Sequence, residues 1–308
     1  MSLPQRTAVD TLLRHAPIDF SGDVAEQRVV LDRVLTAQPR PADVVVTPLT
    51  LGDVPALAVE IDGQAPSGTV LYFHGGVFAL GSAHASVGLT AELARRAGLR
   101  VVTVDYRLAP EHPYPAAPDD ALSAYRALLE LEGGPGSLAI AGESAGGNLA
   151  AVTLVNIRDA GLPLPSAGLL LSPWADLGVT GESVKSKAAV DPALTADALR
   201  VRARDYLRTT DPESPAASPI HADLRGLPPL LIQAGTHEIL LDDAVRLAAR
   251  AAADDVSVTL DVTAEVPHVF QAFAAMLDEG AAALDRAAAF LRDRLREPAA
   301  PAAAPQNP

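Results

Sequence analysis

A five-residue pattern, Gly-Glu-Ser-Ala-Gly at residues 142–146, has the spacing of a sharp turn that exposes a nucleophilic serine. An apolar run of strand length, Leu138–Ala141, precedes the pattern, and a helix-forming run, Gly147–Ala160, follows it. Small residues are needed on both sides of the serine because the chain passes directly from strand into helix. The helix N-terminus also favours negative charge that develops on a substrate. The pattern alone could be a plain glycine-rich turn; with its context it predicts that Ser144 is a nucleophile.

A serine hydroxyl needs a general base, because it is a poor nucleophile at neutral pH. The histidines that follow the serine in the chain are His221, His237 and His268. His268 comes after the last predicted strand, residues 256–262, which is its expected place when the order is nucleophile, acid, histidine. His221 lies in a proline-rich stretch and is expected on the surface. We therefore predict that His268 is the base.

The acid that orients this histidine is expected after the predicted strand Leu230–Ala234. Glu238 lies in the loop just past that strand. Asp242 and Asp243 begin a helix, where the helix dipole alone favours acidic residues. The sequence therefore predicts Glu238 as the acid, with Asp242 as the alternative.

Backbone donors for a developing oxyanion are expected after the buried strand Thr69–Phe73, where the sequence reads His74-Gly75-Gly76. Glycines at that point let N–H groups point into a cleft. Ala145, the residue after the nucleophile, would supply another N–H. His74 precedes the nucleophile in the chain, so we expect it to order the loop rather than to catalyse.

Three motifs resemble, in order and spacing, those of the hormone-sensitive-lipase-like (bacterial family IV) esterases. They are His-Gly-Gly-Val at 74–77, Tyr-Arg-Leu-Ala-Pro-Glu at 106–111 and Gly-Glu-Ser-Ala-Gly at 142–146. The resemblance covers roughly residues 65–295. It implies an α/β-hydrolase fold, with a mainly parallel central sheet flanked by helices and a helical cap. It also implies a serine carboxylesterase that hydrolyses short-to-medium acyl esters through an acyl-enzyme, with no metal and no organic cofactor.

The resemblance also assigns roles to particular residues. The implied catalytic residues are Ser144, Glu238 and His268. The implied oxyanion-hole residues are Gly75, Gly76, Val77 and Ala145.

The chain departs from the family pattern at three of its positions. Val77 replaces the third glycine of the His-Gly-Gly-Gly motif. Since valine avoids positive φ, we expect Gly75 and Gly76 to take the flexible backbone positions. We also expect the Val77 side chain to narrow the acyl side of the substrate pocket. Glu143 replaces an aspartate. Its side chain is longer by one methylene group, which changes its contact with the residues that surround the catalytic ones. Glu238 replaces the first aspartate of the family's Asp-Pro-Leu-x-Asp run, whose last aspartate falls on Asp242.

The rest of the chain alternates strand-length and helix-length apolar runs, which is typical of a mainly parallel sheet. The expected strands are 43–48, 55–61, 69–73, 100–104, 138–141, 168–171, 230–234 and 256–262. The expected helices are 92–97, 119–131, 145–160, 193–207, 242–253 and 281–296. We predict a catalytic domain over residues 41–296, a cap formed by residues 1–40 and by an insertion at about 175–225, and a disordered tail at 297–308.

Composition excludes several classes of function. The 308 residues contain 24 Lys and Arg against 38 Asp and Glu, a net charge of −14, which disfavours nucleic acids and anionic membranes. Cysteine is absent, which excludes disulfides and thiol catalysis. No signal peptide or membrane-length apolar run is found, so a cytoplasmic protein is expected.

These observations favour a small neutral ester as the substrate. A deacetylase, lactonase or amidase with the same triad is the nearest alternative. A small-molecule receptor is another, but all three triad positions are filled, which argues against it. A homodimer through the last strand, 256–262, is possible on sequence grounds, although its alternating apolar residues could equally face the core.

Overall fold

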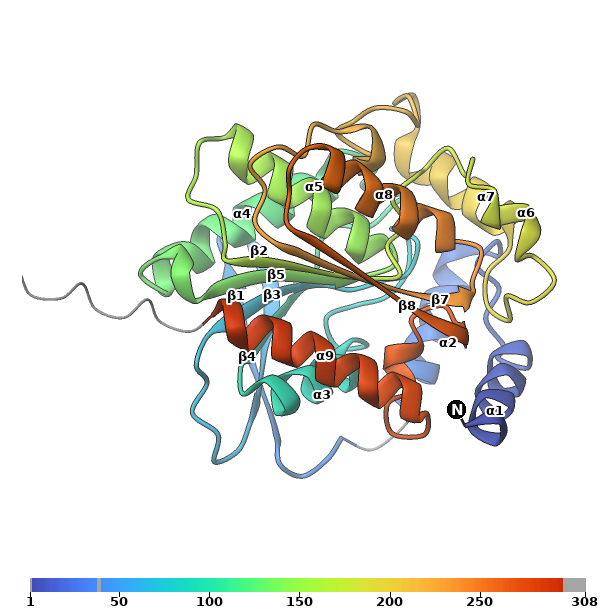
Figure 1. Cartoon of the computed structure of the whole chain (residues 1–308), viewed down its shortest axis with the longest axis horizontal. Helices are drawn as coiled ribbons and strands as arrows, with labels where there is room; N and C mark the ends of the chain where they lie inside the picture. Colours follow the sequence, from blue (N-terminus) through green and yellow to red (C-terminus); the bar gives the residue numbers. More distant parts are fainter. Residues whose placement is uncertain (1, 38–39, 296–308) are drawn as a thin grey trace, which may run out of the picture.

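The computed structural model describes residues 2–37 and 40–295, which fold around one eight-stranded sheet (Figure 1). The sheet order is β1-β2-β4-β3-β5-β6-β7-β8. β1 pairs antiparallel with β2, and β2 with β4; all other neighbours are parallel. The strands are β1 (Val44–Leu51), β2 (Val54–Ile61), β3 (Thr69–Phe73), β4 (Arg100–Val104), β5 (Leu138–Glu143), β6 (Ala167–Leu171), β7 (Leu230–His237) and β8 (Val258–Pro267).

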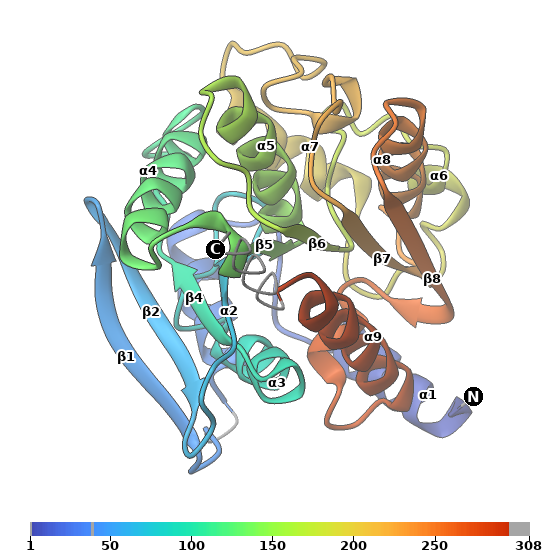
Figure 2. The ribbon, with the colours of Figure 1, turned by 60° about the vertical axis from the view of Figure 1, so that its left-hand side comes forward.

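Helices cover both faces of the sheet, as Figure 2 shows. One face carries α3 (Val87–Ala97) and α9 (Asp278–Arg294). The other face carries α4 (Ala116–Leu131), α5 (Ala145–Asp159) and α8 (Leu241–Ala253). Each face has its own apolar cluster. A sheet covered in this way buries both sides of its central strands, and β3 and β6 are accordingly buried along their whole length.

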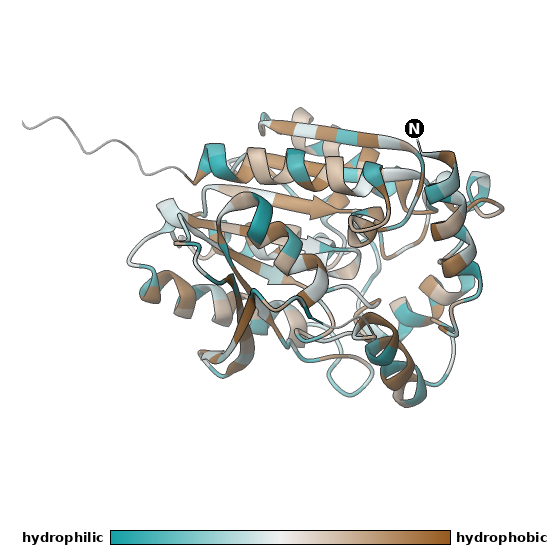
Figure 3. Ribbon diagram, turned by 90° about the horizontal axis from the view of Figure 1, so that it is seen from below, coloured by the Kyte–Doolittle hydropathy of each residue, from teal (hydrophilic) through white to brown (hydrophobic). Residues whose placement is uncertain are grey.

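Apolar and polar residues alternate along the flanking helices (Figure 3), while β3 and β6 in the centre of the sheet are buried throughout. This contrast is the pattern expected when helices present one face to a sheet and the other to water. α3 ends at Gly98, whose left-handed φ of +67° lets its N–H reach back to the Ala94 carbonyl. Its last turn then leads directly into β4.

Most of the predicted elements are confirmed, with shifted ends. The predicted strands 43–48 and 55–61 form the antiparallel β1–β2 pair. The main error concerns the last strand, which was predicted to end at residue 262 but continues to Pro267 as β8. The reason is a bulge between Gly235 and His237, beyond which β7 resumes pairing with β8 at Pro267. The predicted tail at 297–308 lies outside the described residues.

Two stretches far apart in the sequence meet beside the sheet. The N-terminal stretch forms α1 (Leu3–Arg14) and α2 (Val24–Leu35), and the predicted insertion contains the short α6 (Ser183–Ser186) and α7 (Ala196–Leu207). The buried guanidinium of Arg202 in α7 donates to the carbonyls of Phe20 and Gly22. A search of the described helices finds none long and apolar enough to cross a membrane.

Candidate active site

Ser144 lies at the turn between β5 and α5, in a backbone conformation that is uncommon for a residue with a side chain. Its φ is +56° and its ψ is −120°. The turn is held by the Ser144 N–H, which donates to the Leu171 carbonyl of β6 at 2.9 Å. A Cβ atom added to Gly146 would lie 1.9 Å from the Phe73 carbonyl oxygen. The glycine therefore lets α5 begin directly against β3, in agreement with the expected need for a small residue after the serine.

The structure brings the side chains of Ser144, His268 and Glu238 into one line of contacts. His268 Nε2 lies 2.9 Å from Ser144 Oγ, and His268 Nδ1 lies 2.5 Å from Glu238 Oε2. Only 6% of Ser144 is exposed, and Glu238 is fully buried. A serine hydroxyl, an imidazole and a buried carboxylate in this order can perform nucleophilic acyl transfer.

Glu238 is held by a second set of contacts on its other oxygen. Oε1 accepts hydrogen bonds from the Gly235 N–H at 2.7 Å and from Ser172 Oγ at 3.0 Å. Ser172 Oγ in turn accepts from the Val269 N–H at 3.1 Å, next to His268. Ser172 thus links the acid to the histidine loop. Sequence reasoning missed this residue, although its place at the carboxyl end of a parallel strand was a usable signal.

The residues after β3, 74–78, form a loop that packs against the serine turn; we call it the oxyanion loop. The Gly75 N–H donates to Glu143 Oε1 at 2.8 Å. Gly76 has a φ of +113°, Val77 of +53° and Phe78 of +60°. The expectation that glycines alone would take the positive φ values is therefore wrong.

Tertiary contacts impose this backbone on Val77 and Phe78. The Leu80 N–H closes the turn by donating to the Gly76 carbonyl at 2.8 Å. The Phe78 carbonyl accepts from the Ala109 N–H at 2.9 Å, and its ring stacks on Tyr206 with centroids 3.9 Å apart. A left-handed β-branched residue is costly and persists only where such surroundings determine it.

Glu143 is the residue whose change from aspartate was noted in the sequence. Burial raises the pKa of its carboxyl to about 7, although the nearby Tyr72 hydroxyl and the Gly75 N–H on Oε1 act in the opposite direction. Its other oxygen, Oε2, is buried and has no hydrogen-bond partner among the described residues. The Glu143 side chain thus links the serine turn directly to the oxyanion loop.

Comparisons with known proteins identify the family of this chain. A family model for the alpha/beta hydrolase fold matches residues 70–272. The chain is 43% identical to an acetyl-hydrolase of Streptomyces hygroscopicus over 95% of this chain and 97% of that protein, and 37% identical to an esterase of Acinetobacter venetianus over 85% and 87%. The crystal structure of an esterase from the bacterial hormone-sensitive lipase family matches with a TM-score of 0.92 and 40% identity, covering 95% of this chain and 98% of that one. The chain belongs to the bacterial hormone-sensitive lipase family of esterases. It is therefore a carboxylic ester hydrolase, as its motifs predicted.

His74 of this esterase orders the oxyanion loop, in line with the prediction. Its ring stacks on Tyr106 with centroids 4.3 Å apart, and Nδ1 lies 2.7 Å from the Gly75 carbonyl oxygen. Tyr106 also donates its hydroxyl to the His74 carbonyl at 2.7 Å. Burial lowers the pKa of the His74 ring, so the neutral form is favoured. The ring and its neighbour Tyr106 therefore fix the start of the loop.

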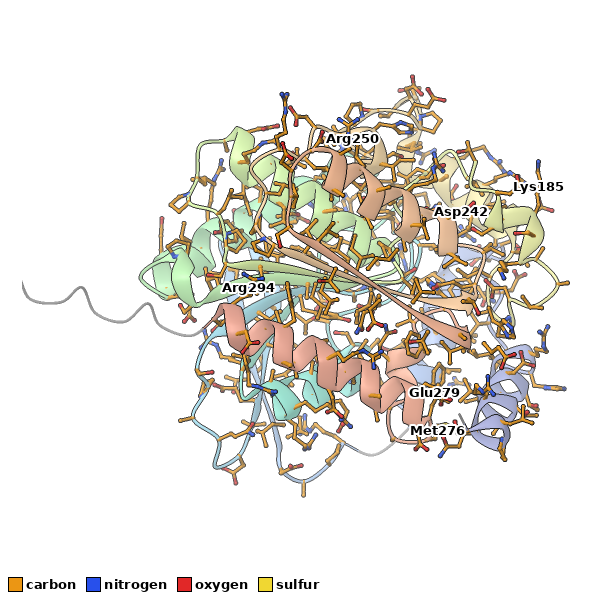
Figure 4. All side chains as sticks on the ribbon, viewed as in Figure 1. Lys185, Asp242, Arg250, Met276, Glu279 and Arg294 are labelled. Atoms are coloured by element: carbon orange, nitrogen blue, oxygen red, sulfur yellow. The ribbon has the colours of Figure 1, made fainter. Side chains whose placement is uncertain are left out.

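Asp242 and Asp243 of the esterase do more than complement the helix dipole. Asp242, labelled at the start of α8 in Figure 4, accepts from the Ser183 N–H at 2.9 Å. Asp243 is buried and accepts from the Asp176 N–H at 2.8 Å. Both aspartates thus hold the insertion against α8. Asp242, the alternative acid, is bonded to the insertion, while Glu238 is the carboxylate that contacts His268.

Proposed function

We propose that this esterase hydrolyses short-to-medium neutral acyl esters through an acyl-enzyme on Ser144, with His268 as the base and Glu238 as the orienting acid. The observation that carries the proposal is the unbroken line of contacts from Ser144 Oγ through His268 to Glu238. Glu238 Oε2 accepts from Nδ1–H, so that Nε2 is left to accept the serine proton.

In the first half of the reaction, Ser144 Oγ attacks the ester carbonyl carbon, and its proton moves to His268 Nε2. The carbonyl oxygen becomes an oxyanion, which backbone N–H groups beside Ser144 stabilise. The bond from the carbonyl carbon to the alkoxy oxygen then breaks. The alcohol leaves with the proton from Nε2, and the acyl group stays on Oγ.

In the second half, water repeats the attack on the acyl-enzyme. His268 Nε2 takes a proton from the water, and a second oxyanion forms. When the bond to Ser144 Oγ breaks, the serine takes the proton back and the carboxylic acid is released. The N-terminus of α5, which begins at Ala145, favours the negative charge in both halves.

Large aromatic side chains near Ser144 support the proposal that the enzyme prefers esters with short-to-medium acyl chains. Phe78, Trp174 and Tyr206 are buried, and the Phe78 and Tyr206 rings stack. Trp174 donates its backbone N–H to the Ser144 carbonyl at 3.0 Å, which places this packed cluster next to the nucleophile. Packed cores resist extra methylenes, so long acyl chains should be disfavoured here. The net charge of −14 favours neutral over anionic esters.

The test is hydrolysis of p-nitrophenyl esters from two to sixteen carbons by the wild type and Ser144→Ala. We expect activity to be highest at short chains and kcat to fall about 10⁴–10⁶-fold in the variant. Circular dichroism should show the same fold in both. Full activity in Ser144→Ala would refute the proposal.

A second candidate is deacetylation of a larger acetylated alcohol. It is favoured by the name of the Streptomyces hygroscopicus relative, acetyl-hydrolase. Chemistry at Ser144 would be the same, and the two candidates differ in which side of the ester is large. Acetyl esters of increasingly large alcohols separate them: a rise in kcat/KM with alcohol size favours the deacetylase.

We also propose that the esterase forms a homodimer through β8. This strand lies at the end of the sheet order and, among the described residues, pairs only with β7. Leu260 and Val262 on it are 36% and 41% exposed. An open strand edge with apolar residues readily accepts a strand from another copy. Sedimentation should give twice the chain mass for the wild type and the chain mass for Val262→Lys. A monomeric wild type would contradict the proposal.

A further inference from the structure

Helix α1, the first helix of the chain, touches the rest of the protein through one face. The residues of α1 and its N-cap that are at least partly buried recur at the spacing of one helix face; they are Ser2, Gln5, Arg6, Val9, Asp10 and Leu13. Leu3 and Leu12 lie outside this face and are 65% and 52% exposed. The helix is therefore a surface element with a defined contact face.

Three residues of this face bond to the two ends of residues 265–279, the stretch that carries the catalytic histidine; we call it the histidine segment. The pairs are Arg6 with Glu265, Gln5 with Asp278, and Ser2 with Glu279. Gln5 and Asp278 exchange two hydrogen bonds of 3.1 Å, and Figure 4 labels Glu279 next to α1. α1 thus connects the end of β8 to the start of α9.

Between these bonds, Val9 packs against the histidine segment itself. Val9, Val266 and Phe270 are fully buried and belong to one apolar cluster. Val266 and Phe270 lie two residues before and two residues after His268. Packed interiors contain little free volume, so an apolar side chain wedged against both neighbours limits the movement of the histidine between them.

The backbone of the histidine segment needs such support, because it is strained on both sides of His268. Glu265 has a φ of +57° and Val269 a φ of +50°, which is costly for residues with side chains and most of all for a β-branched one. From inside the protein, Ser172 Oγ accepts from the Val269 N–H at 3.1 Å. Thr236 Oγ1 accepts from the Glu265 N–H at 2.8 Å. α1 supplies the contacts from the outer side.

The other contacts of the N-terminal stretch are of a different kind. At the end of α1, Arg14 reaches the Val190 carbonyl of the insertion at 3.4 Å, which is longer than the bonds to the histidine segment. In α2, Arg28 donates to the carbonyls of Ala79 and Ala109 at 2.8 and 3.0 Å, which lie on the side of the oxyanion loop. The two N-terminal helices therefore contact opposite sides of the active site.

We infer that α1 positions the histidine segment, with Val9 and Arg6 as positioning residues. Their contacts keep the His268 ring in line between Ser144 Oγ and Glu238. The inference rests on the proposed function, since it concerns the same base. It also changes the role expected for the start of the chain. A cap acts on which esters can bind, whereas α1 acts on the chemical step.

The first experiment compares Val9→Ala and Leu12→Ala in steady-state kinetics on p-nitrophenyl acetate, butyrate and octanoate. Val9→Ala removes two methyl groups from the cluster, which leaves the histidine segment room to shift. We expect its kcat to fall about tenfold, by the same factor on all three esters, with KM changed less than about threefold. Leu12→Ala is the matched control, because it shortens an exposed apolar side chain of the same helix. It should leave kcat unchanged.

An unchanged kcat in a folded Val9→Ala overturns the inference. So does a loss that grows with acyl length, because that is the effect of a cap. Melting temperatures show whether each variant is folded at the assay temperature.

If Val9→Ala is unfolded, Arg6 decides the question, since its ion pair lies outside the apolar cluster. Arg6→Ala should lower kcat about threefold, because Glu265 loses its partner. Arg6→Lys keeps a cation for Glu265 and should recover most of this loss. An unchanged kcat in Arg6→Ala, or an equal loss in Arg6→Lys, overturns the inference.

The last experiment reads the position of His268 without turnover. The 2.5 Å contact between His268 Nδ1 and Glu238 Oε2 should give a low-field proton resonance in the NMR spectrum of the wild type. We expect this resonance to shift or broaden in Val9→Ala and to stay unchanged in Leu12→Ala. An unchanged resonance in Val9→Ala overturns the inference alone. Full activity in Ser144→Ala, assayed alongside, overturns the proposed function and the inference with it.

Discussion

The two halves of the active site are positioned by different physical means. On the nucleophile side, Gly142 and Gly146 allow backbone atoms to approach so closely that an added Cβ would lie about 2 Å from a neighbouring carbonyl oxygen. On the acid–histidine side, buried side chains hold the backbone: Glu238 accepts from Gly235, and Ser172 links Glu238 to the Val269 amide.

This difference indicates what each half tolerates. The close backbone contacts at Gly142 and Gly146 cannot be kept with any other residue, because a side chain at either position would displace the neighbouring backbone. Hydrogen bonds to a carboxylate can be kept by another acceptor, while the charge is lost. Substitutions of Gly142 or Gly146 on the nucleophile side should therefore destroy the fold, and conservative substitutions on the other side should leave the fold and remove the chemistry.

The largest effect is expected for Gly146→Ala. Its Cβ would lie 1.9 Å from the Phe73 carbonyl oxygen, so α5 or β3 must move. Overpacking of this kind costs about 3 kcal/mol or more, and we expect the variant to lose most of its stability, as measured by urea denaturation.

The matched control for Gly146→Ala is Gly88→Ala in α3. Gly88 is exposed, and a Cβ atom added to it would have no neighbouring atom within 4 Å. Alanine should raise stability there by up to about 1 kcal/mol. Equal stability of Gly146→Ala and the wild type would show that the serine turn has more freedom than its contacts indicate.

An intermediate effect is expected for Glu238→Gln, which keeps the shape and removes the charge. We expect kcat to fall about 10⁴-fold with little change in the melting temperature. Asp242→Asn is the control, because Asp242 contacts Ser183 of the insertion. A larger loss of kcat in Asp242→Asn than in Glu238→Gln would mean that the acid has been assigned wrongly.

The smallest effect concerns Glu143, the carboxyl on the nucleophile side. Its pKa is raised from 4.5 to about 7 by burial. Between these values the folded protein keeps a proton that the unfolded chain releases, so the free energy of unfolding falls as pH rises.

Glu143→Gln removes this titration. Urea denaturation of both proteins should therefore show the variant gaining stability relative to the wild type as pH rises from 4.5 to about 7. The comparison between the two proteins cancels the other titrating groups. A constant difference across this pH range would contradict the raised pKa.

The sequence was sufficient for the parts of this site that depend on local pattern. The glycines around Ser144 and the strand before them are local, so the turn could be predicted. The position of His268 followed from chain order, although the bulge at Gly235 extends β8 to Pro267 and moves the boundary that the apolar pattern suggested.

Long-range contacts were not accessible in the same way. Ser172 and Glu238 are 66 residues apart, and the link between Gly75 and Glu143 spans 68. The positive φ values of Val77 and Phe78 were missed because the loop is held through Phe78, which contacts Tyr206 and Ala109, and no local pattern reveals this proximity. Local propensity gave the opposite expectation, and tertiary packing decided the outcome.

The contacts of the N-terminal stretch have a consequence for the order in which the chain can fold during synthesis. The Ser2 hydroxyl donates a hydrogen bond to Glu279, which is synthesised 277 residues later. The Phe20 carbonyl accepts a hydrogen bond from Arg202, which is synthesised 182 residues later. The β1–β2 hairpin and the parallel strands can form as they emerge, since their partners are nearer in the chain. Helix α1 is therefore made well before the residues that hold it, and it is among the last of the described elements to reach its place.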